Sequence, residues 1–372
     1  KLTNMRTIAL LGDDMLEINR ILEILLDKNS DFTEFNEKSK AIYNLSLKQD
    51  KYSIQVVNLD ESDSDTLKVY FNADILIVYF KLVDNKTIDS RIKEHMFMAN
   101  TLGITNVLAI LDSTLISDTK VFIDIRNKIE NSFIKRNFKK RDISFLEYRG
   151  NNDSLKELVY ENLQPKKSKK QIKETNNKLL MSIDNVFRVD KNHLGINGKL
   201  TNGEITKNSV IEILPIKEQY NILEIQARHV SIEKAYQGEH IGFLIKSKNN
   251  LIDNGMVIVN KENDFKLVNE VSIQLINISN TNEQIHLDNT YLCASHNLSK
   301  TGKVNLITVQ ENGKKTVVDK ISKGEKAIIQ LKFREPLFLT PYNINKKFGS
   351  MAILNSEKEC MGLGIIKSVK YK

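Results

Sequence analysis

Short apolar runs alternate with segments of helical periodicity over residues 1–164. The segments with apolar residues at helical spacing cover residues 15–26, 90–102 and 121–138. The apolar runs of five to eight residues cover 7–11, 54–59, 73–80, 107–111 and 143–148. Continuous apolar strands that alternate with helices are typical of a parallel sheet covered on both faces. This region is therefore predicted to be an α/β domain of the doubly wound type.

The pattern changes at Pro165, where a polar and basic stretch begins. Residues 165–178 have no apolar periodicity and are predicted to be an interdomain linker. The lysines singled out here are Lys166, Lys167, Lys169 and Lys170. A solvated tether is the plainer interpretation of this charge run, and contact with RNA is the alternative.

From residue 179 onward, runs rich in Val, Ile and Leu are separated by turn signals. Among the turns are four Asn-Gly pairs, which are the strongest short-range hairpin signal; they begin at Asn197, Asn202, Asn254 and Asn312. Closely spaced short strands are typical of antiparallel barrels, and roughly 190 residues are too many for one small barrel. Two all-β barrels are therefore predicted, at 179–263 and 264–372.

Composition narrows the class of protein. The chain has 372 residues, of which 41% are hydrophobic and 27% charged, and this is enough apolar material for packed cores. No stretch approaches about 18 uncharged apolar residues, so a membrane-spanning helix is excluded, and residues 1–11 do not resemble a secretory signal. Cys293 and Cys360 form no C-x-x-C pair, which favours a reducing, cytoplasmic compartment. The net charge of +8 suits a polyanionic partner without identifying it.

The loop after the first predicted strand is the place where a doubly wound domain would bind phosphate. A phosphate-binding loop needs a second glycine, a lysine for the phosphates and a hydroxyl for the metal. Counting from Gly12, these positions hold Glu17, Ile18 and Asn19. Acidic side chains at a helix N-terminus repel phosphates. We interpret the acids within 13–17 as caps of the following helix.

Other catalytic and metal-binding patterns are missing from the sequence. The six histidines form no H-x-x-x-H or H-E-x-x-H pair, and no G-x-S-x-G elbow occurs. Asp60, Glu61, Asp63 and Asp65 follow a predicted strand and could hold Mg²⁺, although a solvated loop is the plainer interpretation. No catalytic residue and no metal site are predicted, and the sequence favours a protein that is not an enzyme.

Several short motifs occur in a recognisable order along the chain. In the first domain they are A-D-I-L-I-V at 73–78 and R-I-K-E-H followed by T-L-G-I within 91–104. In the barrels they are D-N-V-F at 184–187, G-E-H-I-G-F at 238–243 and a series within 324–369. In order and spacing they resemble the translational GTPases of the elongation factor Tu and elongation factor one-alpha class. The resemblance implies an α/β doubly wound G-like domain followed by two all-β barrels.

The motifs that bind the nucleotide in that class are changed in this chain. The changed positions are Asp112, Ser113 and Leu115 in the guanine-specificity motif, Asp60 and Asp63 in the motif that positions the attacking water, and Arg149 in the later S-G segment. Leu115 stands where an aspartate grips the base, and the histidine that positions the water is missing. The resemblance therefore implies a degenerate site that has lost GTP and Mg²⁺, so that the chain is a pseudo-GTPase without a cofactor.

Within the class, the spacing from Pro336 to Gly349 most resembles the Hbs-type ribosome-rescue factor that partners Pelota. This implies a protein, monomeric outside its complexes, that binds ribosomal RNA and a Pelota- or release-factor-like partner in ribosome rescue and mRNA surveillance. Candidate contacts are the four linker lysines and Arg188. The alternatives are a release-factor-type relative, a Ski-type exosome adaptor and a hibernation factor that occupies the GTPase-factor site. The enzyme alternative is an unorthodox GTPase that uses Lys81 or Lys28.

Overall fold

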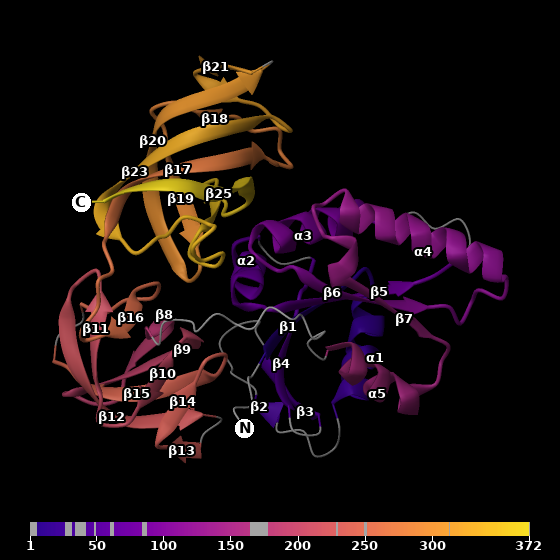
Figure 1. Ribbon diagram of the computed structural model, residues 1–372, viewed down its shortest axis with the longest axis horizontal. Coiled ribbons are helices and arrows are strands. Elements are labelled where there is room, and N and C mark those ends of the chain that lie inside the picture. The colour runs from indigo at the N-terminus through magenta and orange to yellow at the C-terminus, as the bar shows by residue number, and fades with distance from the viewer. Residues whose placement is uncertain are drawn as a thin grey trace. The chain divides into compact units, whose positions relative to one another are not determined.

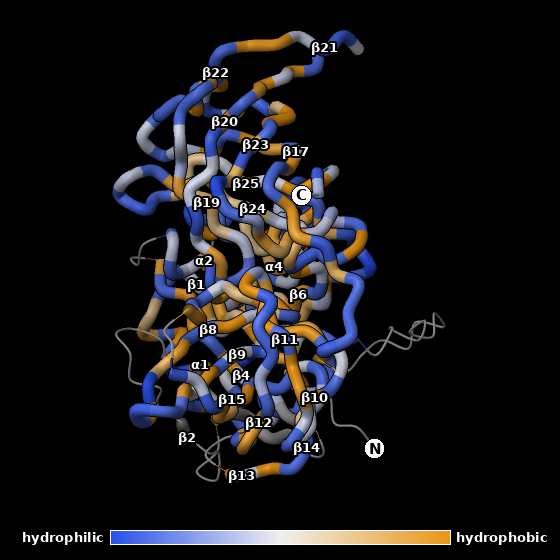
Figure 2. Tube along the Cα trace, turned by 90° about the vertical axis from the view of Figure 1, so that its left-hand side faces the viewer, coloured by the Kyte–Doolittle hydropathy of each residue, from blue (hydrophilic) through white to orange (hydrophobic). Residues whose placement is uncertain are grey.

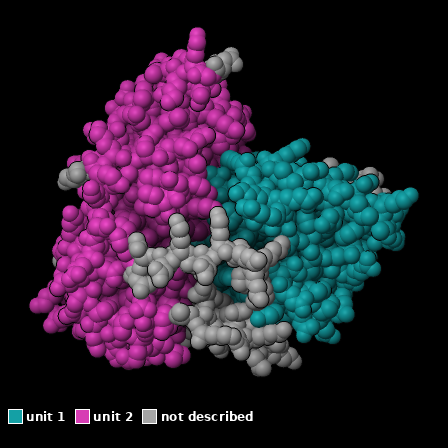
Figure 3. All heavy atoms as spheres, viewed as in Figure 1, with its two compact units in different colours: residues 1–61, 72–173 teal, residues 62–71, 174–372 magenta. Residues whose placement is uncertain are grey.

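A computed structural model of the chain describes residues 6–26, 32–33, 42–47, 50–59, 63–83, 88–163, 178–227, 230–248, 251–311 and 313–371. The chain divides into two compact units, one of residues 1–61 and 72–173, and the other of residues 62–71 and 174–372 (Figure 3). Within the described ranges, no helix is long and apolar enough to cross a membrane.

A seven-stranded sheet forms the centre of the first unit (Figure 1). Its strands, in spatial order, are β2 (Phe32–Thr33), β3 (Ile42–Leu47), β4 (Asp50–Val56), β1 (Arg6–Gly12), β5 (Ile75–Lys81), β6 (Asn106–Asp112) and β7 (Ile143–Tyr148). The five strands β4, β1, β5, β6 and β7 are parallel to one another and correspond to the five predicted apolar runs. The antiparallel strands β2 and β3 at one edge have no continuous apolar run, so the hydrophobic pattern did not indicate them.

Helices cover both faces of this sheet (Figure 1). They are α1 (Met15–Leu25), α3 (Ser90–Thr101), α4 (Thr119–Ile134) and α5 (Asn152–Leu163), with a 3₁₀ turn η1 (Lys140–Asp142) before β7. The helical spacing of Ile18, Ile21, Leu22 and Leu25 places them on one side of α1, where they pack with α5 and alternate strand residues in a single core. The predicted doubly wound α/β architecture is confirmed.

The first barrel of the predicted pair is a closed sheet of six strands. In order around the barrel they are β11 (Val210–Leu214), β16 (Val257–Asn260), β8 (Leu180–Arg188), β9 (His193–Asn202), β15 (His240–Lys246) and β12 (Glu218–Ala227). Pairing of β11 with β12 closes the ring, and β13 (Val230–Ile232) extends β12. A short pair, β10 (Glu204–Thr206) and β14 (Lys234–Tyr236), lies beside it. This ring, called barrel A below, encloses an apolar core.

The last part of the chain forms a second six-stranded ring, called barrel B. Its strands are β19 (Thr290–Ser295), β24 (Ser350–Leu354), β25 (Cys360–Tyr371), β17 (Val268–Asn277), β23 (Lys326–Leu337) and β20 (Leu298–Glu311). Pairing of β19 with β20 closes the ring, and β21 (Lys314–Val317), β18 (Ile285–His286) and β22 (Lys320–Ile321) lie outside it.

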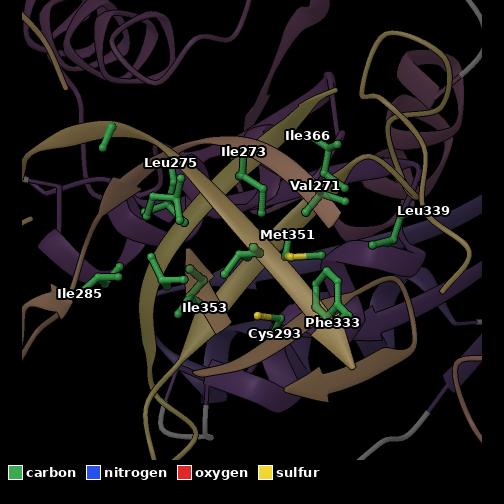
Figure 4. Packing of buried hydrophobic residues seen from close by; sticks show 14 of the residues in the cluster. Val271, Ile273, Leu275, Ile285, Cys293, Phe333, Leu339, Met351, Ile353 and Ile366 are labelled. Carbon is green, nitrogen blue, oxygen red and sulfur yellow. The ribbon is translucent and has the colours of Figure 1, made fainter. Parts of the chain in front are cut away.

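Alternation of apolar and polar residues along the strands sets the inside and outside of barrel B (Figure 2). Val271, Ile273 and Leu275 of β17 point into the interior, where they meet Met351 and Ile353 of β24 (Figure 4). Both predicted barrels are therefore confirmed. Helix α2 (Asp63–Asn72) lies in the chain between β4 and β5, yet residues 62–71 belong to the unit that contains the barrels.

Candidate functional site

The carboxyl ends of four parallel strands form one edge of the sheet in the first unit. Here β1 ends at Gly12, β5 at Lys81, β6 at Asp112 and β7 at Tyr148. Doubly wound domains bind their ligands at this edge, because the loops that follow the strands gather there. We call these four strand ends, with the loops that follow them, the carboxyl edge.

A carboxylate of the chain itself occupies the N-terminus of α1. Only Asp13 and Asp14 separate the end of β1 from the start of α1 at Met15. The Asp14 carboxylate accepts hydrogen bonds from the backbone N–H of Leu16 at 2.9 Å and of Glu17 at 3.4 Å. Free N–H groups at such a helix end are the ones that bind phosphate in nucleotide-binding loops. The cap predicted from the sequence is present at Asp14.

The residue at the position of a phosphate-binding lysine points away from the carboxyl edge. Ile18 is fully buried in the core beneath α1. A Cβ atom added to Gly12 would lie 2.5 Å from Cδ1 of Ile18, so the glycine leaves space for this side chain. Burying an isoleucine side chain contributes about 2 kcal/mol to the free energy of folding. Asn19, at the position of the metal-binding hydroxyl, is exposed. The turn that would wrap around phosphates is here the first turn of a helix.

Charged side chains at the carboxyl edge pair with one another. Lys81 Nζ donates to Glu17 Oε1 at 2.6 Å, and this hydrogen bond, followed by the charge of Glu17, raises the pKa of Lys81. Arg20 Nε lies 3.3 Å from Glu17 Oε2, and Arg20 Nη2 lies 3.7 Å from Asp112 Oδ2. The hydroxyl of Tyr79 donates to Asp112, and burial and then this carboxylate raise the pKa of the phenol. Two acids and two bases thus neutralise each other.

The residues at the guanine-specificity motif are also bonded internally. The Thr114 hydroxyl and backbone N–H both donate to Asp112 Oδ1, at 2.6 and 3.0 Å, in a local turn. Ser113 Oγ donates to Glu147 Oε1 at 2.8 Å, and Arg149 Nε donates to the same oxygen at 2.9 Å. Arg149 is the main cause of the lowered pKa of Glu147.

Leu115 occupies the position of the base-gripping aspartate and is 62% exposed. An alkyl side chain has no acceptor for the hydrogen-bond donors of a guanine edge. The structure therefore brings Asp112, Ser113 and Arg149 together, while Leu115 points to solvent.

Asp63 belongs to the unit that contains the barrels. It is the first residue of α2, and its Oδ2 accepts the backbone N–H of Cys360 in β25 at 2.7 Å. Burial raises its pKa, the Cys360 hydrogen bond opposes this, and the charge of Glu359 adds to it. The interpretation as a solvated loop is wrong for Asp63, because this long-range contact half-buries the carboxylate. Asp60 lies outside the described residues, and among the described residues no cluster of three metal ligands occurs.

The other end of α2 carries a contact that sequence reasoning missed. Lys347 Nζ of barrel B donates to the backbone carbonyl of Tyr70 at 3.0 Å. A cation at the C-terminal carbonyls of a helix interacts favourably with the helix dipole. The only sequence signal was a lysine in a loop, which is too common to indicate a partner.

The predicted contact residues are only partly within the described residues. Lys166, Lys167, Lys169, Lys170 and Lys28 lie outside them. Arg188 is exposed at the end of β8, and its Nη1 donates to the carbonyls of Asp190 and Lys191 at 3.3 Å. It therefore holds the β8–β9 turn and still presents part of its charge to solvent.

Comparison with known proteins identifies relatives of the same architecture. The chain is 23% identical over 323 residues to the apicoplast elongation factor Tu of Plasmodium falciparum, which covers 80% of this chain and 76% of that protein. Apo translation elongation factor SelB of Methanococcus maripaludis superposes with a TM-score of 0.66 at 14% identity, over 100% of this chain and 81% of SelB.

A bacterial selenocysteine-specific elongation factor, EF-Sec, superposes with a TM-score of 0.67 at 16% identity, over 98% of this chain and 58% of that one. No family profile matches the sequence. The α/β domain followed by two six-stranded barrels is the fold of these elongation factors, and the sequence similarity to an elongation factor Tu extends over most of the chain.

Proposed function

We propose that this chain is a translation factor that acts on the ribosome as a pseudo-GTPase, without binding or hydrolysing GTP. The observation that carries the proposal is the α1 N-terminus, where the carboxylate of Asp14 takes the backbone N–H groups that a phosphate would need. The relatives of this fold are translation elongation factors, which supports the ribosome as the site of action.

Electrostatics at the carboxyl edge supports the loss of the nucleotide. A triphosphate placed there would face Asp13 and Asp14, and two like charges 4 Å apart repel by about 1 kcal/mol in water and about 4 kcal/mol at an effective dielectric near 20. Lys81, which the structure places at this edge, is already bonded to Glu17. An unorthodox GTPase built on Lys81 would have to break this pair first.

Charge is distributed unevenly along the chain. Residues 264–372 hold 16 basic and 10 acidic residues, a net charge of +6, whereas residues 1–164 have a net charge of −3. The basic linker at 165–178 adds to the positive part. The linker and barrel B are therefore the regions proposed to bind a polyanionic partner such as ribosomal RNA. Binding of this kind weakens steeply as the salt concentration rises.

Ribosome rescue with a Pelota-like protein is the role that we propose within this class. The support is the spacing from Pro336 to Gly349, which resembles Hbs-type factors. A hibernation factor, a release-factor relative and an exosome adaptor have the same shape requirements. Purified ribosomes separate these roles, because rescue requires the partner protein to enhance binding to stalled ribosomes, whereas a hibernation factor binds idle ribosomes alone and dissociates slowly.

Two measurements test the loss of the nucleotide. Calorimetry with GTP and Mg²⁺ is expected to give no binding heat, and co-sedimentation with ribosomes is expected to be the same with and without GTP. Micromolar affinity for GTP, or pelleting that requires GTP, would overturn the proposal. Equal pelleting at low and physiological salt would contradict the contact with RNA.

A further inference from the structure

Barrels A and B meet at a small seam within the second unit. Its apolar part consists of Leu180, Leu214, Val257 and Val259 from barrel A with Phe338 and Phe348 from the chain of barrel B, and the partly buried Phe265 and Leu267 pack against it. The rings of Phe338 and Phe348 lie edge to face, with centroids 5.3 Å apart. So few apolar residues make the polar groups beside them important for the stability of the contact.

A histidine of barrel B is buried at this seam. His296 lies in the two-residue turn between β19 and β20, with a φ of +42° and 4% exposure. Its Nδ1 is 2.8 Å from the hydroxyl of Ser182 in β8, and its ring centroid is 4.6 Å from that of Phe348. The other ring nitrogen, Nε2, is buried and has no well-formed hydrogen bond within the described residues.

The β19–β20 turn that carries His296 packs closely against barrel A. A Cβ atom on Gly255 of barrel A would lie 2.5 Å from Cα of Leu298 and 2.8 Å from the carbonyl oxygen of Asn297. The Asn297 amide donates to the Ser182 hydroxyl at 3.2 Å and also to Asp184. A buried charge needs water or a counter-charge, and a side chain that is 4% exposed, as that of His296 is, has little contact with bulk water.

The ionisable groups near the seam do not compensate a charge on His296. The ionisable groups next to the seam residues in the chain are Asp184 in β8, His240 at the start of β15, Asp253 before Gly255, and Lys346 and Lys347 before Phe348. Asp184 is bonded to Asn297 and lies 3.9 Å from Nδ1 of His240. Burial lowers the pKa of His296 to about 3, and the backbone of Phe338 opposes this only in part.

We propose that the seam is a pH-sensitive latch, in which neutral His296 holds the β19–β20 turn of barrel B against β8 of barrel A and protonated His296 releases it. Protonation makes both ring nitrogens donors and places a positive charge on a ring that is 4% exposed and lies against the ring of Phe348. This device does not depend on a nucleotide and goes beyond the function proposed above.

The direction of the effect follows from linkage. A histidine whose pKa is lowered in the closed state stabilises that state above its free value of 6.5, and this stabilisation is lost as the pH falls below 6.5. With a closed-state pKa of about 3, the closed-to-open ratio falls about thirtyfold between pH 7.5 and pH 5.0.

Hydrogen exchange of the full chain at the two pH values tests the latch. After correction for intrinsic exchange rates, peptides that cover β8 and the β19–β20 turn are expected to lose protection about thirtyfold more than peptides of β17 in the interior of barrel B. His296→Asn keeps a polar group beside Ser182, tolerates the positive φ and cannot titrate, so its seam peptides are expected to show no extra pH response. His286→Asn, in the strand β18 outside the ring of barrel B, is the matched control and should behave as the wild type.

The latch is overturned if seam and β17 peptides lose protection equally in the wild type, or if His296→Asn retains the wild-type response. If His296→Asn does not fold, the pKa of His296 in the wild type, measured by nuclear magnetic resonance, tests the latch instead. A pKa below about 5 supports the latch. A pKa near 6.5 contradicts it.

Discussion

Polar groups at the carboxyl edge of the sheet and at the seam between the barrels are held in opposite ways. At the edge, Glu17 pairs with Lys81 and Arg20, and the side chains of Lys81 and Arg20 remain 35% and 47% exposed. At the seam, His296 and Ser182 are neutral and buried. Partly exposed ion pairs are screened by water and contribute little to stability, whereas a buried neutral pair contributes more and does not tolerate a charge. The ion pairs at the carboxyl edge can therefore be replaced at little cost in stability, whereas a change at the seam is expected to cost more.

The largest expected effect tests how tight the seam is. Gly255→Ala adds a Cβ 2.5 Å from the backbone of Leu298 at a residue with a φ of +82°, and we expect a loss of about 3 kcal/mol in the free energy of unfolding. Gly313→Ala is the matched control, because Gly313 has a φ of +78° and open space around it; its loss should be about 1 kcal/mol. Urea unfolding followed by circular dichroism measures both. Equal losses would mean that the seam is not tightly packed.

The next effect tests the buried end of the edge network. Asp112→Ala leaves the buried Tyr79 hydroxyl without its acceptor, and we expect a loss of about 2 kcal/mol in unfolding free energy. Adding Tyr79→Phe to that variant removes the unpaired hydroxyl and should restore most of the loss. A double variant that is less stable than Asp112→Ala alone would contradict this explanation.

A smaller effect is expected from the hydroxyl at the seam. Ser182→Ala removes the hydrogen bond to Nδ1 of His296 but leaves the apolar cluster intact, so the loss should be about 1 kcal/mol at pH 7.5. At pH 5.0 we expect this variant to open more readily than the wild type, as measured by exchange of β19–β20 peptides. No difference at either pH would show that the hydroxyl does not hold the turn.

The smallest effect is expected at the exposed end of the edge network. Lys81→Met removes the contact with Glu17 and should lower stability less than Ser182→Ala does, because the pair is partly exposed. The effect should shrink further in 1 M salt, where charges are screened within about 3 Å. A large loss that is independent of salt, measured by thermal unfolding, would mean that the edge is as rigid as the seam.

Much of the fold could be predicted from the sequence, because its signals are local. The helical spacing in residues 15–26 and the apolar runs on either side predict a covered parallel sheet, and the Asn-Gly pairs after residue 179 predict short antiparallel strands. β2 and β3 were missed because they lack a continuous apolar run. The carboxyl edge was located by counting from Gly12, but its ion pairs were not foreseen.

By itself, the sequence determined the kind and order of the elements and the residues at the end of each strand, because hydrophobic periodicity and turn chemistry act between neighbours in the chain. Only the tertiary structure decided that Lys81 meets Glu17, that Asp63 meets Cys360 and that Ser182 meets His296. These partners are 64, 297 and 114 residues apart, and the packing of whole elements, which no local pattern specifies, brings them within hydrogen-bond distance.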